Sequence, residues 1–91
     1  MFTLTEAAGA RLAEKLTEKN AGGNVSLRFA RQTEPRGWKL RLDKPSPADT
    51  ALSHDGRVVL VFDEQSSHLL RNKVLDTRET DEGPRLQLRG A

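Results

Sequence analysis

The 91-residue chain contains no cysteine and no tyrosine, and its aromatic residues are one tryptophan and three phenylalanines. Without cysteine it has no disulfide, no thiolate metal ligand and no cysteine nucleophile. The longest apolar run, Val58–Phe62, is far shorter than the roughly 20 residues that span a bilayer. The N-terminus also lacks the charged and apolar regions of a signal peptide. We therefore expect a cytoplasmic protein that does not contact a membrane.

Charge and length set further bounds. Fifteen basic and thirteen acidic side chains give a formal net charge of +2, which does not by itself indicate nucleic-acid binding. A chain of this length forms one domain, residues 1–91, with a small core.

Apolar residues recur at every fourth position up to Leu16, which predicts an amphipathic helix over about 5–19. Thr5 is a candidate N-cap because its hydroxyl could accept a hydrogen bond from the first turn. Thr3 with Glu6 could instead form a capping box.

The rest of the chain is dominated by short strand patterns. Alternating apolar and polar residues predict strands over 25–30 and 38–43, joined by a turn at 32–37. The uninterrupted apolar run 58–62 predicts a strand buried on both faces. Further strands are expected at 50–53, 74–80 and 85–89, an Asp-Gly hairpin turn at 55–56 and a short helix at about 64–71. This order predicts an α+β or mostly β domain flanked by the two helices.

Several short motifs also follow one another in a recognisable order. They are Leu4-Thr5 with Ala8, Ser26-Leu-Arg28, Pro47-Ala-Asp49, Asp55-Gly56, Val58–Asp63 with Ser66, and Leu75-Asp76. In that order they resemble the HesB/IscA-like family of A-type iron–sulfur cluster carriers, over about residues 3–89. The resemblance implies a HesB-like β-sandwich, or pseudo-barrel, of short mixed strands that assembles as a homodimer.

The ligands of that family are absent. The resemblance implies three thiolates, one in the turn after the first long strand and a Cys-Gly-Cys pair near the C-terminus. Here Glu34 or Pro35 stands near the first position, and the sequence ends at Ala91, roughly where the pair would begin. Because iron–sulfur clusters prefer thiolates, the resemblance indicates a degenerate member without a cofactor and without catalytic activity.

Two hypotheses for the function follow. The first is a non-catalytic accessory or protein-interaction module related to iron–sulfur cluster assembly. The alternative is a small-ligand or oxygen-ligated metal-binding module that uses the vacated cluster pocket, with Glu34, Arg36 and His54. An ordinary solvent-exposed hairpin loop explains the same turn residues.

The two histidines provide a weaker indication of chemistry. His54 and His68 could hold a metal with Asp55 or Glu64, but their separation matches no standard ligand spacing. We therefore interpret both as ordinary exposed histidines. The run Ser66-Ser67-His68 after Asp63 contains the residue types of a catalytic triad, yet helix capping explains these residues better.

Cations on the first two long strands suggest a partner surface. Arg28, Lys39 and Arg41 alternate with apolar residues, so pairing of the strands would gather them on one outer face, with Arg85 and Arg89 as candidate extensions. Such a patch would fit an acidic partner protein, and nucleic acid is the less favoured partner. A solvated sheet face is the competing interpretation.

Overall fold

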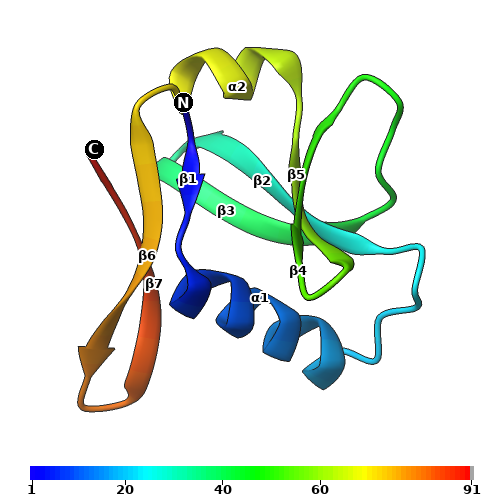
Figure 1. Ribbon diagram of the computed structural model, residues 1–91. Helices are drawn as coiled ribbons and strands as arrows, with labels where there is room; N and C mark the ends of the chain where they lie inside the picture. The colour runs from blue at the N-terminus through cyan, green and yellow to red at the C-terminus, as the bar shows by residue number, and fades with distance from the viewer. Residues whose placement is uncertain (91) are drawn as a thin grey trace.

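The computed structural model describes residues 1–90, and the side chain of Arg36 lies outside the described part. Two sheets with strand orders β1-β6-β7 and β3-β2-β5-β4 pack against one side of the first helix (Figure 1). The pairs β1–β6 and β2–β5 are parallel and the others are antiparallel. The elements are β1 Thr3–Leu4, α1 Glu6–Glu18, β2 Ser26–Thr33, β3 Arg36–Asp43, β4 Thr50–His54, β5 Arg57–Phe62, α2 Glu64–Leu69, β6 Lys73–Thr80 and β7 Gly83–Gly90.

Both helices begin where the sequence predicts. The Thr5 hydroxyl accepts a hydrogen bond from the amide of Ala8 (3.2 Å), so Thr5 rather than Thr3 caps α1. Asp63 caps α2 by accepting from the amide of Ser66 (2.7 Å). These carboxylate and hydroxyl oxygens satisfy amides that have no partner inside the helix.

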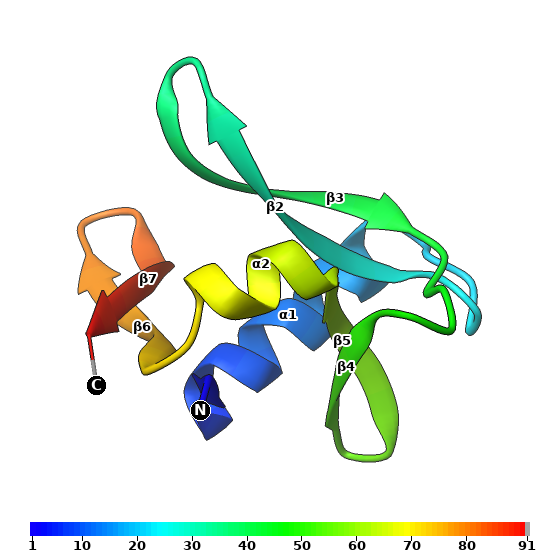
Figure 2. The same cartoon turned by 90° about the horizontal axis from the view of Figure 1, so that it is seen from above.

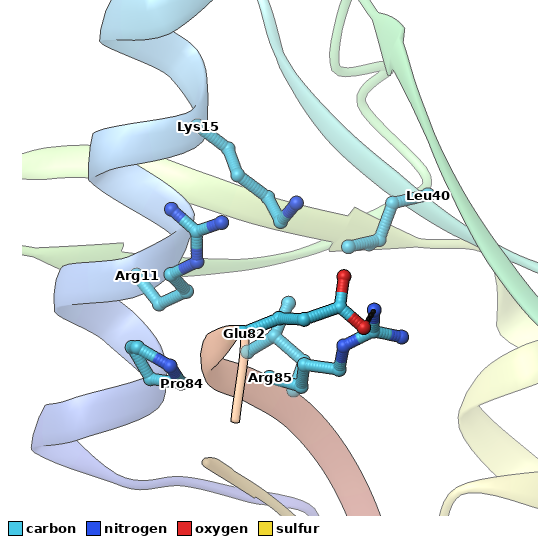
Figure 3. Close-up of a pocket in the computed structure, with 7 residues that line it drawn as sticks. Arg11, Lys15, Leu40, Glu82, Pro84 and Arg85 are labelled. Carbon is cyan, nitrogen blue, oxygen red and sulfur yellow. Dashed lines mark ion pairs between the residues drawn. The ribbon is translucent and has the colours of Figure 1, made fainter. Parts of the chain in front are cut away.

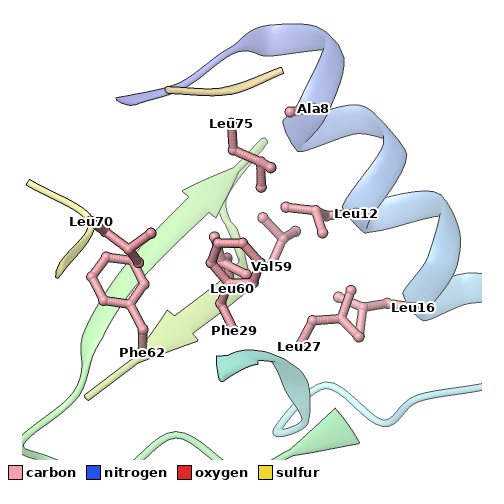
Figure 4. Packing of buried hydrophobic residues seen from close by; sticks show 10 residues of the cluster. All are labelled: Ala8, Leu12, Leu16, Leu27, Phe29, Val59, Leu60, Phe62, Leu70 and Leu75. Carbon is pink, nitrogen blue, oxygen red and sulfur yellow. The ribbon is translucent and has the colours of Figure 1, made fainter. Parts of the chain in front are cut away.

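The core lies between α1 and the two sheets (Figure 4). Leu12 and Leu16 of α1 are fully buried, and α1 contacts strands of both sheets. Every residue from Val59 to Phe62 is buried, which confirms that β5 is covered on both faces. The expected α+β, mostly β architecture of mixed strands is therefore confirmed. No helix within residues 1–90 is long and apolar enough to cross a membrane.

Two local predictions need correction. The two-residue strand β1 was not predicted, since it is too short to show a periodic pattern. The turn predicted at 32–37 is narrower, because strand pairing continues to Thr33 and Arg36 and leaves Glu34 and Pro35 at the tip of the β2–β3 hairpin. The Asp-Gly turn is as expected, with both residues at positive φ (51° at Asp55) as a two-residue hairpin requires.

Candidate functional site

The hairpin tip where the resemblance would put a cysteine is an exposed turn. Glu34 and Pro35 are both exposed there. The backbone of Arg36 begins β3, but its side chain lies outside the described residues, so its predicted role stays a prediction. The sequence contains no cysteine at this or any other position, so the chain itself offers no thiolate.

His54 lies at the other end of the sheet from Glu34. Leu27 of β2 pairs with Leu60 of the parallel strand β5, which places the β4–β5 turn before this pair and the β2–β3 tip well after it. The two turns accordingly point away from each other in both views of the fold (Figure 2). The structure therefore does not unite Glu34 and His54 in one pocket.

The prediction that His54 is exposed is wrong. Its side chain is only 13% exposed because its ring packs on the α1 backbone at Gly9, where an added Cβ would lie 2.8 Å from Nδ1. The carboxylate of Glu6 lies 3.8 Å from Nδ1 and that of Asp55 lies 3.4 Å from Nε2. One ligand atom from each of the three residues can be chosen so that all lie within 4.8 Å of one another. His68 is exposed, as expected.

Arg28 is not part of an exposed cationic patch, which corrects another prediction. Strand pairing does place it opposite Arg41, but its side chain is 14% exposed and enters an ion-pair network. Its Nε donates to Asp43 (2.8 Å), while Nη1 and Nη2 donate to the two oxygens of Asp49 (3.0 and 2.6 Å). Asp49 also accepts from the amide of Ser46 (2.7 Å). The network fixes the proline-containing loop 44–49 to the sheet.

Electrostatics of this network follow from its hydrogen bonds. Donation from Arg28 holds the pKa of Asp49 and that of Asp43 below their ordinary values. The same carboxylates raise the pKa of Arg28, so its charge is permanent and already neutralised. Only Lys39 and Arg41 of the three predicted cations remain exposed for a partner.

Arg85 and Arg89 do not extend this surface, since both belong to β7 of the other sheet. Arg85 pairs with Glu82 (3.3 Å), and Arg89 pairs with Asp76 (3.2 Å). Sequence alternation located these cations on strands correctly, but it carries no information on which sheet each strand joins.

A second polar connection joins the start of α1 to strand β6. Thr5, besides capping α1, donates its hydroxyl proton to Asp76 on β6 (2.8 Å). The amide of Thr77 donates to the same carboxylate (2.8 Å), and these bonds hold the pKa of Asp76 below its ordinary value. Thr5 and Asp76, like Arg28 and Asp49, come from motifs that carry the family resemblance. Those motifs contact each other in the fold.

Comparisons with known proteins support this architecture. No protein-family model matches the sequence, and no curated protein matches it. Solved structures do match it, and two of them align with nearly the whole chain. One is Escherichia coli SufA, involved in biosynthesis of iron–sulfur clusters, with a TM-score of 0.71 and 22% identity over 98% of this chain and 84% of that chain. The chain has the SufA fold. IscA, solved with its 2Fe–2S cluster, matches with a TM-score of 0.67 and 22% identity over 99% of this chain and 85% of that chain.

Proposed function

We propose that this protein is a cysteine-free, non-catalytic accessory module of iron–sulfur cluster assembly, which acts through protein contacts as a homodimer in the cytoplasm. The observation that carries the proposal is a SufA-like and IscA-like fold over nearly the whole chain, in a sequence without a single thiolate. Soft iron–sulfide clusters prefer thiolates to carboxylates. The scaffold would therefore be retained for what it binds on its surface.

Two of the residues whose types could suggest a catalytic triad, Asp63 and Ser66, take part in helix capping. Asp63 accepts a hydrogen bond from the amide of Ser66 at the start of α2, and this bond holds the pKa of Asp63 below its ordinary value.

Exposed Lys39 and Arg41 on the outer face of β3 are the surface we assign to an acidic partner. Beside Arg41, a cavity of about 580 Å³ lies between this face and α2.

The first test is native mass spectrometry on protein purified without oxygen from its own host. We expect a dimer mass with no iron or sulfide. Iron and sulfide that survive a chelator would overturn the proposal.

The partner surface is tested by affinity purification with quantitative mass spectrometry. We expect the unchanged protein to enrich a component of cluster assembly, and the charge reversal Lys39→Glu with Arg41→Glu to abolish that enrichment. The matched control reverses exposed Lys73 and Arg78 on β6, which changes the net charge equally. Equal loss in both variants would show a nonspecific charge effect and contradict the assigned surface.

A second candidate is a metal-binding module at a different place from the predicted pocket of Glu34, Arg36 and His54. It is favoured by the convergence of two carboxylates, Glu6 and Asp55, on the imidazole of His54. Each carboxylate lies beside a different ring nitrogen, so one of these exposed side chains would have to swing to share an ion. Under this candidate Zn²⁺ raises the melting temperature of the protein and of His68→Ala, but not of His54→Ala. Identical melting curves with and without Zn²⁺ would exclude this candidate.

A further inference from the structure

Two neighbouring cavities lie between the β2–β3 and β6–β7 hairpins. The first, about 460 Å³, lies between α1, Leu40 of β3 and the turn of the β6–β7 hairpin (Figure 3). The second, about 270 Å³, lies deeper between the two sheets. Both are lined by Leu40 and Leu86, so they lie side by side. We call them together the inter-hairpin groove.

The deep end of the groove is entirely apolar in its lining. Phe29 and Leu75 form its buried floor. Its walls are only partly buried, because the leucines of β3 and β7 belong to different sheets and do not close on each other. The wall residues are Trp38, Leu40, Leu86 and Leu88. An apolar chain placed here would cover hydrophobic surface that water now contacts.

Charged side chains line the mouth of the groove. Arg11, Lys15 and Arg85 line it together with one acid, Glu82. Figure 3 shows Lys15 extending from α1 toward the side chains of Glu82 and Arg85 on the opposite hairpin, whereas the guanidinium of Arg11 is turned along α1. Arg11 pairs through Nη1 with Glu14 and Glu18, yet its Nε is buried and has no hydrogen-bond partner in the described structure. Lys15 forms no ion pair within the described residues, so it is the cation at the mouth that is available to a ligand.

We propose that the inter-hairpin groove binds a medium-chain carboxylate. The acyl chain occupies the apolar end, and the carboxylate lies at the mouth, where Lys15 donates a charge-assisted hydrogen bond to it. A small ligand of this kind suits cavities of these volumes. The inference stands apart from the accessory function, because it uses the opposite side of the β2–β3 hairpin from Lys39 and Arg41.

The single tryptophan supplies the assay, since Trp38 lines the apolar end and stacks on Phe29 at 4.9 Å between ring centroids. Titration with dodecanoate, kept below micelle-forming concentrations, should change Trp38 fluorescence saturably with one ligand per chain. Dodecyltrimethylammonium has the same tail and the opposite head, and acetate has the head alone. We expect at least a tenfold weaker response to each of them.

Variants separate the head and tail contacts. Lys15→Glu should weaken dodecanoate binding about tenfold or more, through loss of a charge-assisted contact. The control Lys73→Glu, an exposed site on β6, should leave it within twofold. Leu86→Trp should fill the groove and abolish saturable binding, with circular dichroism confirming that the variant folds.

Three outcomes would overturn the proposal. The first is no saturable change with dodecanoate. The second is equal affinity for the cationic detergent, which would indicate nonspecific hydrophobic binding. The third is a dimer in solution that dodecanoate does not change and that the Leu86→Trp substitution dissociates. That result would indicate that a second copy of the chain covers the groove.

Discussion

Replacing Asp49 with asparagine removes one charge from the Arg28 network while keeping the side chain's shape. Asp49 is 5% exposed and accepts two hydrogen bonds from Arg28, of which the amide oxygen of asparagine can retain one. Removing one member of a buried ion pair costs about 3–5 kcal/mol when the remaining charge is left alone. Here Asp43 still neutralises Arg28 and solvent reaches the pair, so we expect a loss of about 2 kcal/mol in the free energy of unfolding. For a domain of this size the melting temperature should fall by about 8–16 °C.

The dependence on pH provides a second, independent measurement. Because Arg28 holds the pKa of folded Asp49 below that of an unfolded aspartate, about 3.9, the unfolded chain binds more protons between the two values. The stabilisation by this ion pair is therefore complete at pH values above the pKa of Asp49 in the unfolded chain. It is lost as pH falls through the pKa of Asp49 in the folded protein. The difference in the free energy of unfolding between the unchanged protein and Asp49→Asn should be largest near pH 7 and should disappear in acid.

Thermal unfolding followed by circular dichroism at several pH values measures both effects. Asp81→Asn, an exposed turn position, is the matched control and should change the free energy of unfolding by less than about 0.5 kcal/mol. The reasoning would be refuted by a melting temperature of Asp49→Asn within 2 °C of the unchanged protein, or by a gap that is the same at pH 7 and in acid.

Two further substitutions test α1 by the same thermal unfolding. Thr5→Ala removes both the helix cap and the hydrogen bond to Asp76, so it should lower the free energy of unfolding by about 1–2 kcal/mol. The control Thr17→Ala, at an exposed position of α1, should change it little. Equal losses in the two variants would contradict the capping role. Gly9→Ala should destabilise the protein although alanine favours helix by about 1 kcal/mol, because the new Cβ meets the ring of His54. In a His54→Ala background most of that cost should disappear, and an undiminished cost would show that the ring is not the obstacle.

Sequence periodicity predicted the elements whose environment is uniform along their length. The spacing that ends at Leu16 identified α1, and the run Val58–Phe62 identified the doubly covered strand, because burial repeats there with the period of the backbone. The turn at Asp55-Gly56 was predicted from its Asp-Gly pair, and the strand expected at 50–53 before it is β4, Thr50–His54. The two-residue strand β1 exists only because Leu4 pairs with Leu75, which no local pattern records.

The candidate site was less predictable because it depends on contacts between distant segments. Strand alternation placed Arg28 on the outer face, but its neutralisation requires the loop that carries Asp49 to fold back on the sheet. Burial of His54 likewise depends on the missing side chain at Gly9. The inter-hairpin groove was missed entirely, although the alternation of Leu40, Leu86 and Leu88 indicated apolar faces that would need a cover.

The hydrogen-bonded motif pairs have a consequence for how such a fold diverges. Thr5 with Asp76 and Arg28 with Asp49 join segments that are far apart in the sequence, while Asp63 caps α2 by accepting a hydrogen bond from the amide of Ser66. Each of these bonds is formed by groups of the protein alone. The contacts that hold this architecture together therefore use no thiolate, and the fold forms in a sequence without cysteine. Distant relatives of this chain are therefore better sought by these paired positions than by cysteine patterns.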